Sequence, residues 1–242
     1  LAPDIRRRHN TRMIKKPRLL PILPNLITVG NGICGFAAIV KGLKVGVVVD
    51  EAGISHLQGE EYLVYGAWLI LLGMVFDVFD GRVARMTGQT SELGGQLDSL
   101  CDLVSFGLAP AILVVRMNMA APRMWQNLVW FLCLLYFIGA LLRLARFNVE
   151  NEEDESAHLC FKGLPSPAAA GCVSTLVIFY YYIMNFEAKE LQFLADHRDL
   201  LQQAVSWLPV GLAFLAAILG YTMVHARLKF DHVASRLFAR RQ

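Results

Sequence analysis

Apolar residues dominate the chain in long blocks, not at the alternating or helical spacing of a soluble core. Six blocks stand out, at residues 26–48, 62–83, 97–117, 124–146, 165–186 and 206–226. Each block has about the ~20 residues that a helix needs to cross the hydrocarbon core of a bilayer. The pattern therefore predicts an all-α integral membrane protein with six transmembrane helices.

The first block differs from the others because it is rich in glycine and carries Lys41 and Lys44. Its glycines would let another helix approach closely, and its lysines would reach an interface. Pro21 and Pro24 stand just before it. Because proline removes a backbone donor, we expect this stretch to be an interfacial segment and not part of a membrane helix.

Composition supports the membrane prediction, since 55% of the 242 residues are hydrophobic and only 18% are charged. The net charge is +3, and both terminal segments are basic. Beside apolar spans, basic tails favour retention in the cytoplasm over nucleic-acid binding. We expect a basic interfacial segment at 1–25, a membrane domain at 26–226 and a basic tail at 227–242, with both termini cytoplasmic.

Four aspartates lie where the second block ends and the third begins, within DVFDGRVARMTGQTSELGGQLDSLCD. Asp77 and Asp80 are three residues apart, and Asp98 and Asp102 are four apart, so each pair shares a helix face. A short loop joins the two helices, which predicts an antiparallel hairpin with four converging carboxylates. Each ionised aspartate deep in a membrane costs about 2.5–3.5 kcal/mol, so a compensating charge is required.

An all-oxygen set of this kind suits Mg²⁺ or Mn²⁺ better than zinc, and two such ions would suit phosphoryl chemistry. Gly81 follows Asp80 directly and Gly94 precedes Asp98 by four residues, so the backbone leaves room for an anionic ligand. Arg85 would offer a forked donor to a phosphate. Taken alone, Arg85 would be interpreted as an interface arginine, but within this group we favour a ligand contact.

The segment from Asp77 to Asp102 resembles the signature of the CDP-alcohol phosphatidyltransferase family. The matching positions are Asp77-x2-Asp80-Gly81-x2-Ala84-Arg85-x8-Gly94-x3-Asp98-x3-Asp102. The resemblance implies six membrane helices, a homodimer, and a di-metal site reached from the cytoplasm with Mg²⁺ or Mn²⁺. It also implies that a CDP-linked lipid transfers its phosphatidyl group to an alcohol and releases CMP.

The same resemblance implies roles for individual residues. Asp77, Asp80 and Asp98 would be metal ligands, and Asp102 would be both a ligand and the base that accepts the proton of the attacking hydroxyl. The residues expected to contact the CDP-lipid are Gly81, Ala84, Arg85, Ser91 and Gly94, together with Asn25 and Thr28 of the motif PNLIT. For Asn25 and Thr28 the alternative is an N-cap and an ordinary helix threonine.

Three further segments resemble the membrane-embedded phosphatidylserine synthase branch of bacteria and archaea. They are LPNLITVGNGICGF from Leu23, LRLARFN from Leu142 and FKGLPSPA from Phe161. This likeness implies CDP-diacylglycerol and L-serine as substrates and the inner membrane of a prokaryote as location. Arg143, Arg146 and Lys162 lie at the depth expected for Asp102, so we expect them to bind the serine carboxylate or a lipid phosphate. Positive-inside anchoring is the alternative for each.

Other functions remain open at this point. The acceptor could be glycerol 3-phosphate, inositol phosphate or choline in place of serine. A divalent-cation channel or transporter is a remote alternative, because the aspartates gather at one end of a hairpin and do not follow a path through the membrane. A catalytically dead scaffold is disfavoured because no signature carboxylate is replaced.

Overall fold

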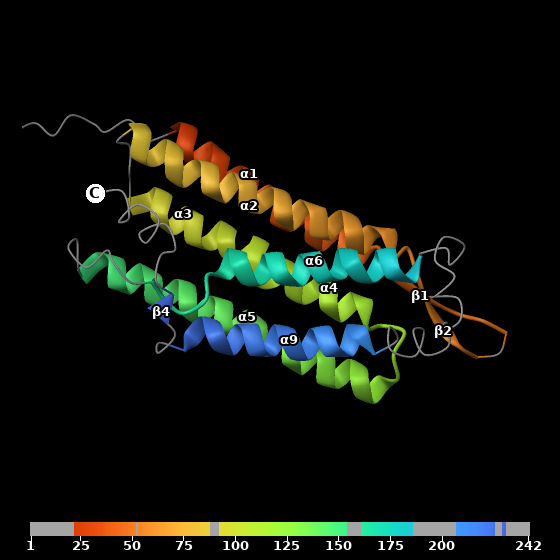
Figure 1. Ribbon diagram of the computed structural model, residues 1–242. Helices are drawn as coiled ribbons and strands as arrows, with labels where there is room; N and C mark the ends of the chain where they lie inside the picture. Colours follow the sequence, from red (N-terminus) through yellow and green to blue (C-terminus); the bar gives the residue numbers. More distant parts are fainter. Residues whose placement is uncertain are drawn as a thin grey trace, which may run out of the picture.

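The computed structural model describes residues 22–51, 53–87, 92–153, 161–185, 207–225 and 229–230. These residues form a bundle of long helices with two small strand pairs at its ends (Figure 1). Five helical segments are long and apolar enough to cross a membrane, and a sixth apolar helix is shorter. The predicted all-α membrane architecture is therefore confirmed.

The first half of the bundle is built from α1 (Ile22–Leu43), α2 (Glu61–Thr87), α3 (Glu92–Asp102) and α4 (Ala109–Met117). α1 runs beside α2 along their shared length, and α3 and α4 form one continuous span through a π-helical segment, η1 (Leu103–Leu108) (Figure 1). The second half consists of α5 (Arg123–Glu153), α6 (Ser166–Met184) and α9 (Leu208–Val224), and α9 packs along α5.

The first span begins and ends earlier than its apolar block indicates. α1 already starts at Ile22, so Pro24 is part of the helix, contrary to expectation, while residues 1–21 of the expected interfacial segment lie outside the described residues. Pro24 falls in the first turn of the helix, where a backbone N–H has no partner to lose. At the other end the helix stops at Leu43, and Gly46–Val49 form the strand β1. β1 pairs antiparallel with β2 (Ser55–Gln58), a hairpin that the sequence analysis did not predict.

The fourth span is longer than expected. α5 continues to Glu153, past the end of its apolar block at residue 146 and into the acidic residues Glu150, Glu152 and Glu153. Glutamate is a good helix former, so the helix can extend beyond the apolar block. After α5 the strand β3 (Phe161–Lys162) pairs with β4 (Lys229–Phe230), which follows α9.

The π-helical segment in the third span has a local cause in the sequence. Pro110 has no backbone N–H, so the carbonyl oxygen of Phe106 loses the partner that a regular α-helix would supply four residues later. The hydroxyl of Tyr136 donates to that oxygen at 2.7 Å instead. Both Phe106 and Tyr136 are fully buried. The wide turn thus directly follows Asp102 and is held by a side chain of α5.

Glycines bring helix backbones together at two places. An added Cβ at Gly35 would lie 2.6 Å from the Cα of Ser105, and one at Gly139 would lie 2.3 Å from the carbonyl oxygen of Gly220. At both positions a residue larger than glycine would not fit between the two backbones. α1 therefore packs tightly on η1, and α5 packs tightly on α9, as small residues permit between membrane helices.

Candidate functional site

The four aspartates meet at one end of the bundle. Asp77 and Asp80 lie near the end of α2, and Asp98 and Asp102 lie on α3, the next helix in the chain. The first turns of α1, the last turns of α5 and the start of α6 lie at this same end (Figure 1). We call it the aspartate end. The helical hairpin predicted from the spacing of the two pairs is present.

Three of the carboxylates come close enough to share a cation. One oxygen each from Asp77, Asp98 and Asp102 lies within 4.8 Å of the others. Asp98 Oδ1 is buried and has no hydrogen-bond partner within the described part of the chain. A buried acceptor without a donor is costly, and a bound cation would satisfy it. The donor set, carboxylate oxygens only, fits a hard divalent cation such as Mg²⁺ or Mn²⁺.

Asp80 is placed differently from the other three. It is only 5% exposed and lies outside the close triplet, although its charge acts on Asp77, Asp98 and Asp102. The Thr28 hydroxyl lies 2.8 Å from Asp80 Oδ2 and 3.1 Å from the Pro24 carbonyl oxygen. The hydroxyl has one proton, and the nearer, ionised acceptor is the stronger one. Thr28 therefore orients the Asp80 side chain across the α1–α2 contact.

The predicted role of Asn25 as an N-cap is excluded, because α1 begins three residues before it. Asn25 is half-buried and lies one helical turn before Thr28, so both residues are at the aspartate end. Their predicted contact with the nucleotide stays a prediction. For Thr28 it agrees with the hydrogen bond to Asp80.

Three cations were predicted to bind the serine carboxylate or a lipid phosphate, and the structure places them differently. Arg143 is half-buried, its charge acts on Asp102 and Asp77, and its Nη1 donates to Ser166 Oγ at 2.7 Å. Arg146, one turn later on α5, is exposed. Lys162 lies in β3, and its side chain lies outside the described part of the structure. Arg143 is thus the described cation of the three that faces the carboxylates.

The remaining signature residues surround the loop between α2 and α3. A Cβ added at Gly81 would lie 3.7 Å from Arg85 Nη1, so the guanidinium folds back over the glycine. Arg85 is exposed and Gly94 is half-buried on α3. Ser91 and the side chain of Ala84 lie outside the described residues. The open face of Gly81 and the nearby guanidinium leave room for an anionic group, and these contacts stay predictions.

Three polar residues at this end were missed by the sequence analysis. Asn31, Ser105 and Ser166 are each fully buried. Asn31 donates from Nδ2 to Asp102 Oδ1 at 2.9 Å, and Ser105 donates from Oγ to the Asn31 carbonyl oxygen at 2.9 Å. A signal was available, because Asn31 is an amide inside an apolar block and follows Thr28 by three residues. Polar side chains are rare in such positions unless they have a partner.

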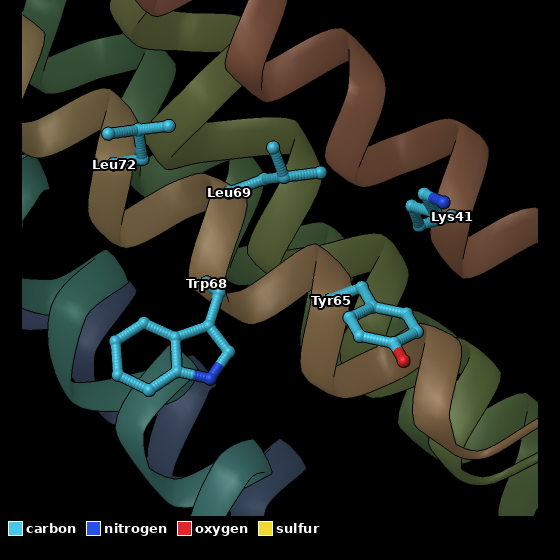
Figure 2. Close-up of a pocket in the computed structure, with 5 residues that line it drawn as sticks. All are labelled: Lys41, Tyr65, Trp68, Leu69 and Leu72. Atoms are coloured by element: carbon cyan, nitrogen blue, oxygen red, sulfur yellow. The ribbon is translucent and has the colours of Figure 1, made fainter.

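A hollow on the surface lies away from this site. Lys41 of α1 and Tyr65, Trp68, Leu69 and Leu72 of α2 line a groove of about 360 Å³ (Figure 2). The Lys41 ammonium lies 5.6 Å from the centre of the Tyr65 ring. Lys41 follows Thr28 by 13 residues, about 20 Å along a helix. The groove is therefore distinct from the aspartate end.

Comparison with known proteins places the chain in a family. The model of the CDP-alcohol phosphatidyltransferase family matches residues 21–218. The chain is similar to CDP-diacylglycerol–serine O-phosphatidyltransferase of Bacillus subtilis, with 34% identity over 67% of this chain and 78% of that protein. It is also similar to the enzyme of that name from Saccharomyces cerevisiae, with 37% identity over 62% of this chain and 51% of the yeast protein. The mycobacterial relatives are likewise matched over only about half, 51%, of their length.

A solved structure shares the fold. Phosphatidylinositol phosphate synthase from Mycobacterium tuberculosis, crystallised with CDP-DAG bound, superimposes with a TM-score of 0.50. The match covers 83% of this chain and 82% of that one at 16% identity. The family match across most of the chain establishes that the chain belongs to the CDP-alcohol phosphatidyltransferase family.

Proposed function

We propose that the protein transfers the phosphatidyl group of CDP-diacylglycerol to the hydroxyl of L-serine, giving phosphatidylserine and CMP. The observation that carries this proposal is the group formed by Asp77, Asp98 and Asp102, whose oxygens lie within 4.8 Å of one another, with Arg143 facing them. The relatives named as serine phosphatidyltransferases support serine as the acceptor.

The aspartates would hold the divalent cations. Asp77, Asp98 and Asp102 are the candidate ligands of a first ion, and Asp80, braced by Thr28, would help to hold a second. Bound there, the cations would neutralise charge on the pyrophosphate of the CDP-lipid. Either Mg²⁺ or Mn²⁺ fits an all-carboxylate set.

The chain's own groups would carry out the remaining steps. The serine hydroxyl oxygen forms a bond to the phosphorus that carries diacylglycerol, and the bond from that phosphorus to the CMP oxygen breaks. Asp102 accepts the hydroxyl proton as general base. Arg143 offers its guanidinium to the serine carboxylate, since Ser166 holds it toward the site. Gly81 and Arg85 would contact the phosphates that leave with the nucleotide.

The protein would work in the inner membrane of a prokaryote, with the aspartate end and both termini in the cytoplasm. The described residues at the opposite end also include cations, Lys44, Arg116 and Arg123, so this orientation rests on the basic tails. A green fluorescent protein fused to the C-terminus should fluoresce, and alkaline phosphatase fused there should be inactive. The reverse pair of results would overturn the orientation.

A homodimer is proposed on the family resemblance. The large apolar side chains exposed on the outer helix faces would be covered by lipid and by the second copy. The mass of the purified protein in detergent, measured by light scattering, should be that of two chains. A single chain at all protein concentrations would exclude the dimer.

The proposed reaction can be tested with purified protein in detergent. CMP release from CDP-diacylglycerol is measured with serine, glycerol 3-phosphate, inositol phosphate or choline, each with Mn²⁺ and with a chelator. We expect release with serine and Mn²⁺ only, and phosphatidylserine in the lipid extract. Release with another alcohol would keep the family chemistry and overturn serine as the acceptor. No release with any alcohol would overturn the proposal.

A further inference from the structure

Asn31 is a polar side chain at a place where α1, α2 and α3 meet. It is 0% exposed and lies in the middle of an apolar membrane helix. Burying an amide in such surroundings without partners is unfavourable. Asn31 has partners on one side only. Its Nδ2 donates to Asp102 Oδ1 at 2.9 Å, while its Oδ1 is buried without a partner among the described residues.

The backbone of Asn31 is tied to the same helix as its side chain. Ser105 Oγ donates to the Asn31 carbonyl oxygen at 2.9 Å. Asp102 is the last residue of α3, and Ser105 lies in the wide turn of η1 that follows it. One residue of α1 thus braces both sides of the junction between α3 and η1. The backbone of Asp102 keeps helical angles (φ −60°, ψ −41°), so this brace acts on the direction of its side chain.

α2 packs against the Asn31 amide from the other side. A Cβ added at Gly73 of α2 would lie 2.8 Å from Asn31 Oδ1, so only glycine fits there without displacing the amide. Gly73 precedes Asp77 by one helical turn. The carboxamide is therefore held between the helix that carries Asp77 and the helix that carries Asp102.

The donor to Asp102 is a neutral amide, and this choice affects the charge of the carboxylate. An arginine or lysine at this place would pair with Asp102 as an ion and compete with a bound cation for it. A neutral amide donates one hydrogen bond and leaves the negative charge of Asp102 in place. The outer partners of metal-ligating groups commonly act in this way, by fixing the orientation of a ligand.

We infer that Asn31 is a positioning residue that orients the Asp102 carboxylate for cation binding and for proton transfer. Gly73 leaves the space that the Asn31 amide requires. This inference rests on the proposed function, because it assigns Asn31 to the same site. It extends that function to a residue outside the motif from Asp77 to Asp102 and outside PNLIT.

The test uses Asn31→Leu, which keeps a similar volume and removes the donor. Mn²⁺ binding is measured without substrate, by the electron paramagnetic resonance signal of free Mn²⁺, and CMP release is measured in parallel. We expect Mn²⁺ affinity to fall about 10–100-fold and kcat to fall in the same range, as for other outer partners of metal ligands. The KM for CDP-diacylglycerol should change less than about threefold, because the amide does not contact the lipid.

A matched control separates positioning from general stability. Asn118 is also a buried asparagine, and its Nδ2 donates to the carbonyl oxygens of Val114 at 2.9 Å and Pro209 at 3.0 Å, away from the aspartates. Asn118→Leu should lower the melting temperature and leave Mn²⁺ affinity and kcat per folded molecule unchanged. If both asparagine variants lowered Mn²⁺ affinity equally, the positioning role would be wrong.

A second pair of variants leaves Asn31 in place and keeps the inference testable if Asn31→Leu does not fold. Gly73→Ala should displace the amide and reproduce the loss of Mn²⁺ affinity. Gly66→Ala, two turns earlier on α2, brings a Cβ to 2.9 Å from a methyl group of Leu113, away from the site. It should leave the affinity unchanged. Full Mn²⁺ affinity in Gly73→Ala would overturn the inference.

Failure of the proposed function can be told apart from failure of this inference. If the wild-type protein binds Mn²⁺ but releases no CMP, while Asn31→Leu and Gly73→Ala bind Mn²⁺ more weakly, the reaction is wrong and the positioning role stands. If the wild-type protein is active and both variants keep its Mn²⁺ affinity and kcat, the reaction stands and the positioning role is wrong.

Discussion

The two ends of the bundle use buried polar side chains in different ways. At the end opposite to the aspartates, Asn118 and Arg116 donate to backbone carbonyl oxygens, and these bonds tie helix ends together. At the aspartate end, Thr28 and Asn31 donate to the side chains of Asp80 and Asp102. The first arrangement stabilises the fold, whereas the second orients carboxylates that the fold does not need.

The two ends also differ in how their carboxylates are placed. At the aspartate end three carboxylate oxygens lie within 4.8 Å of one another, and Asp98 Oδ1 has no donor among the described residues. An acidic side chain at the other end, Asp50, lies on the exposed hairpin and contacts His56 at 3.1 Å. Buried like charges without partners are unfavourable unless a cation is present, so the comparison supports the proposal that cations bind at the aspartate end.

The largest effect that distinguishes the two ends is expected for Asp102→Asn. Removing the proposed base should lower kcat by about 10²–10⁴-fold, the range for loss of a general base. Asp50→Asn should leave kcat unchanged, because Asp50 lies on the hairpin at the other end. The measurement is CMP release at saturating serine. Equal rates for Asp102→Asn and the wild-type protein would exclude Asp102 as the base.

The next effect concerns the two arginines at the end of α5. Arg143→Gln should raise the KM for serine by about 10–100-fold, the value of a hydrogen bond to a charged group. Arg146→Gln is the matched control and should change that KM by less than about twofold, because its side chain is exposed. Serine titrations at fixed CDP-diacylglycerol measure both. A larger change in Arg146→Gln would reverse the assignment.

A smaller effect is expected at the opposite end, and on stability only. Arg116 donates to the carbonyl oxygens of Gly42, Leu43 and Val45, which close the end of α1. Arg116→Gln should lower the free energy of unfolding by about 1–2 kcal/mol. The kcat of the folded fraction should stay as in the wild-type protein. A selective loss of kcat with normal thermal stability would show that this end takes part in the reaction.

The smallest effect is a pH dependence at Glu60, just before α2. Burial, and then the nearby charge of Glu61, raise the pKa of Glu60 above its ordinary value of 4.5. The folded state thus binds this proton more tightly than the unfolded state, so stability falls as pH rises through the folded pKa. Glu60→Gln should therefore raise the melting temperature at neutral pH and have no effect well below pH 4.5. A gain of equal size at both pH values would contradict this cause.

The sequence predicts much of the aspartate end because its geometry is local. The intervals between Asp77 and Asp80 and between Asp98 and Asp102 match one helical turn, and the short loop makes the two helices antiparallel neighbours. Nothing beyond helix geometry and chain connection is needed to bring these residues together.

Other features depend on contacts between distant segments and were not predicted. The partner that satisfies the Phe106 carbonyl oxygen in the π-helical segment is the Tyr136 hydroxyl, 30 residues away, although the local cause of the segment, Pro110, stands in the sequence. Most of β1 was taken as part of the first span because Val47 and Val48 extend its apolar block, and β2 lies in the stretch between the first two blocks, where no strand was predicted. These β-branched residues favour a strand once the helix has ended. Asn31 was overlooked because its partner, Asp102, is 71 residues away.

The most direct test of the central claim is Mn²⁺ binding to purified protein without substrate, compared between wild type and Asp98→Asn. Asp98 is the aspartate whose buried oxygen lacks a donor, so its loss should affect the cation more than the fold. We predict that the wild-type protein binds Mn²⁺, and that Asp98→Asn binds it at least about tenfold more weakly while its melting temperature in the absence of metal stays equal or rises, because one of the buried like charges is removed. Equal Mn²⁺ binding by the two proteins would show that the aspartate end is not the cation site.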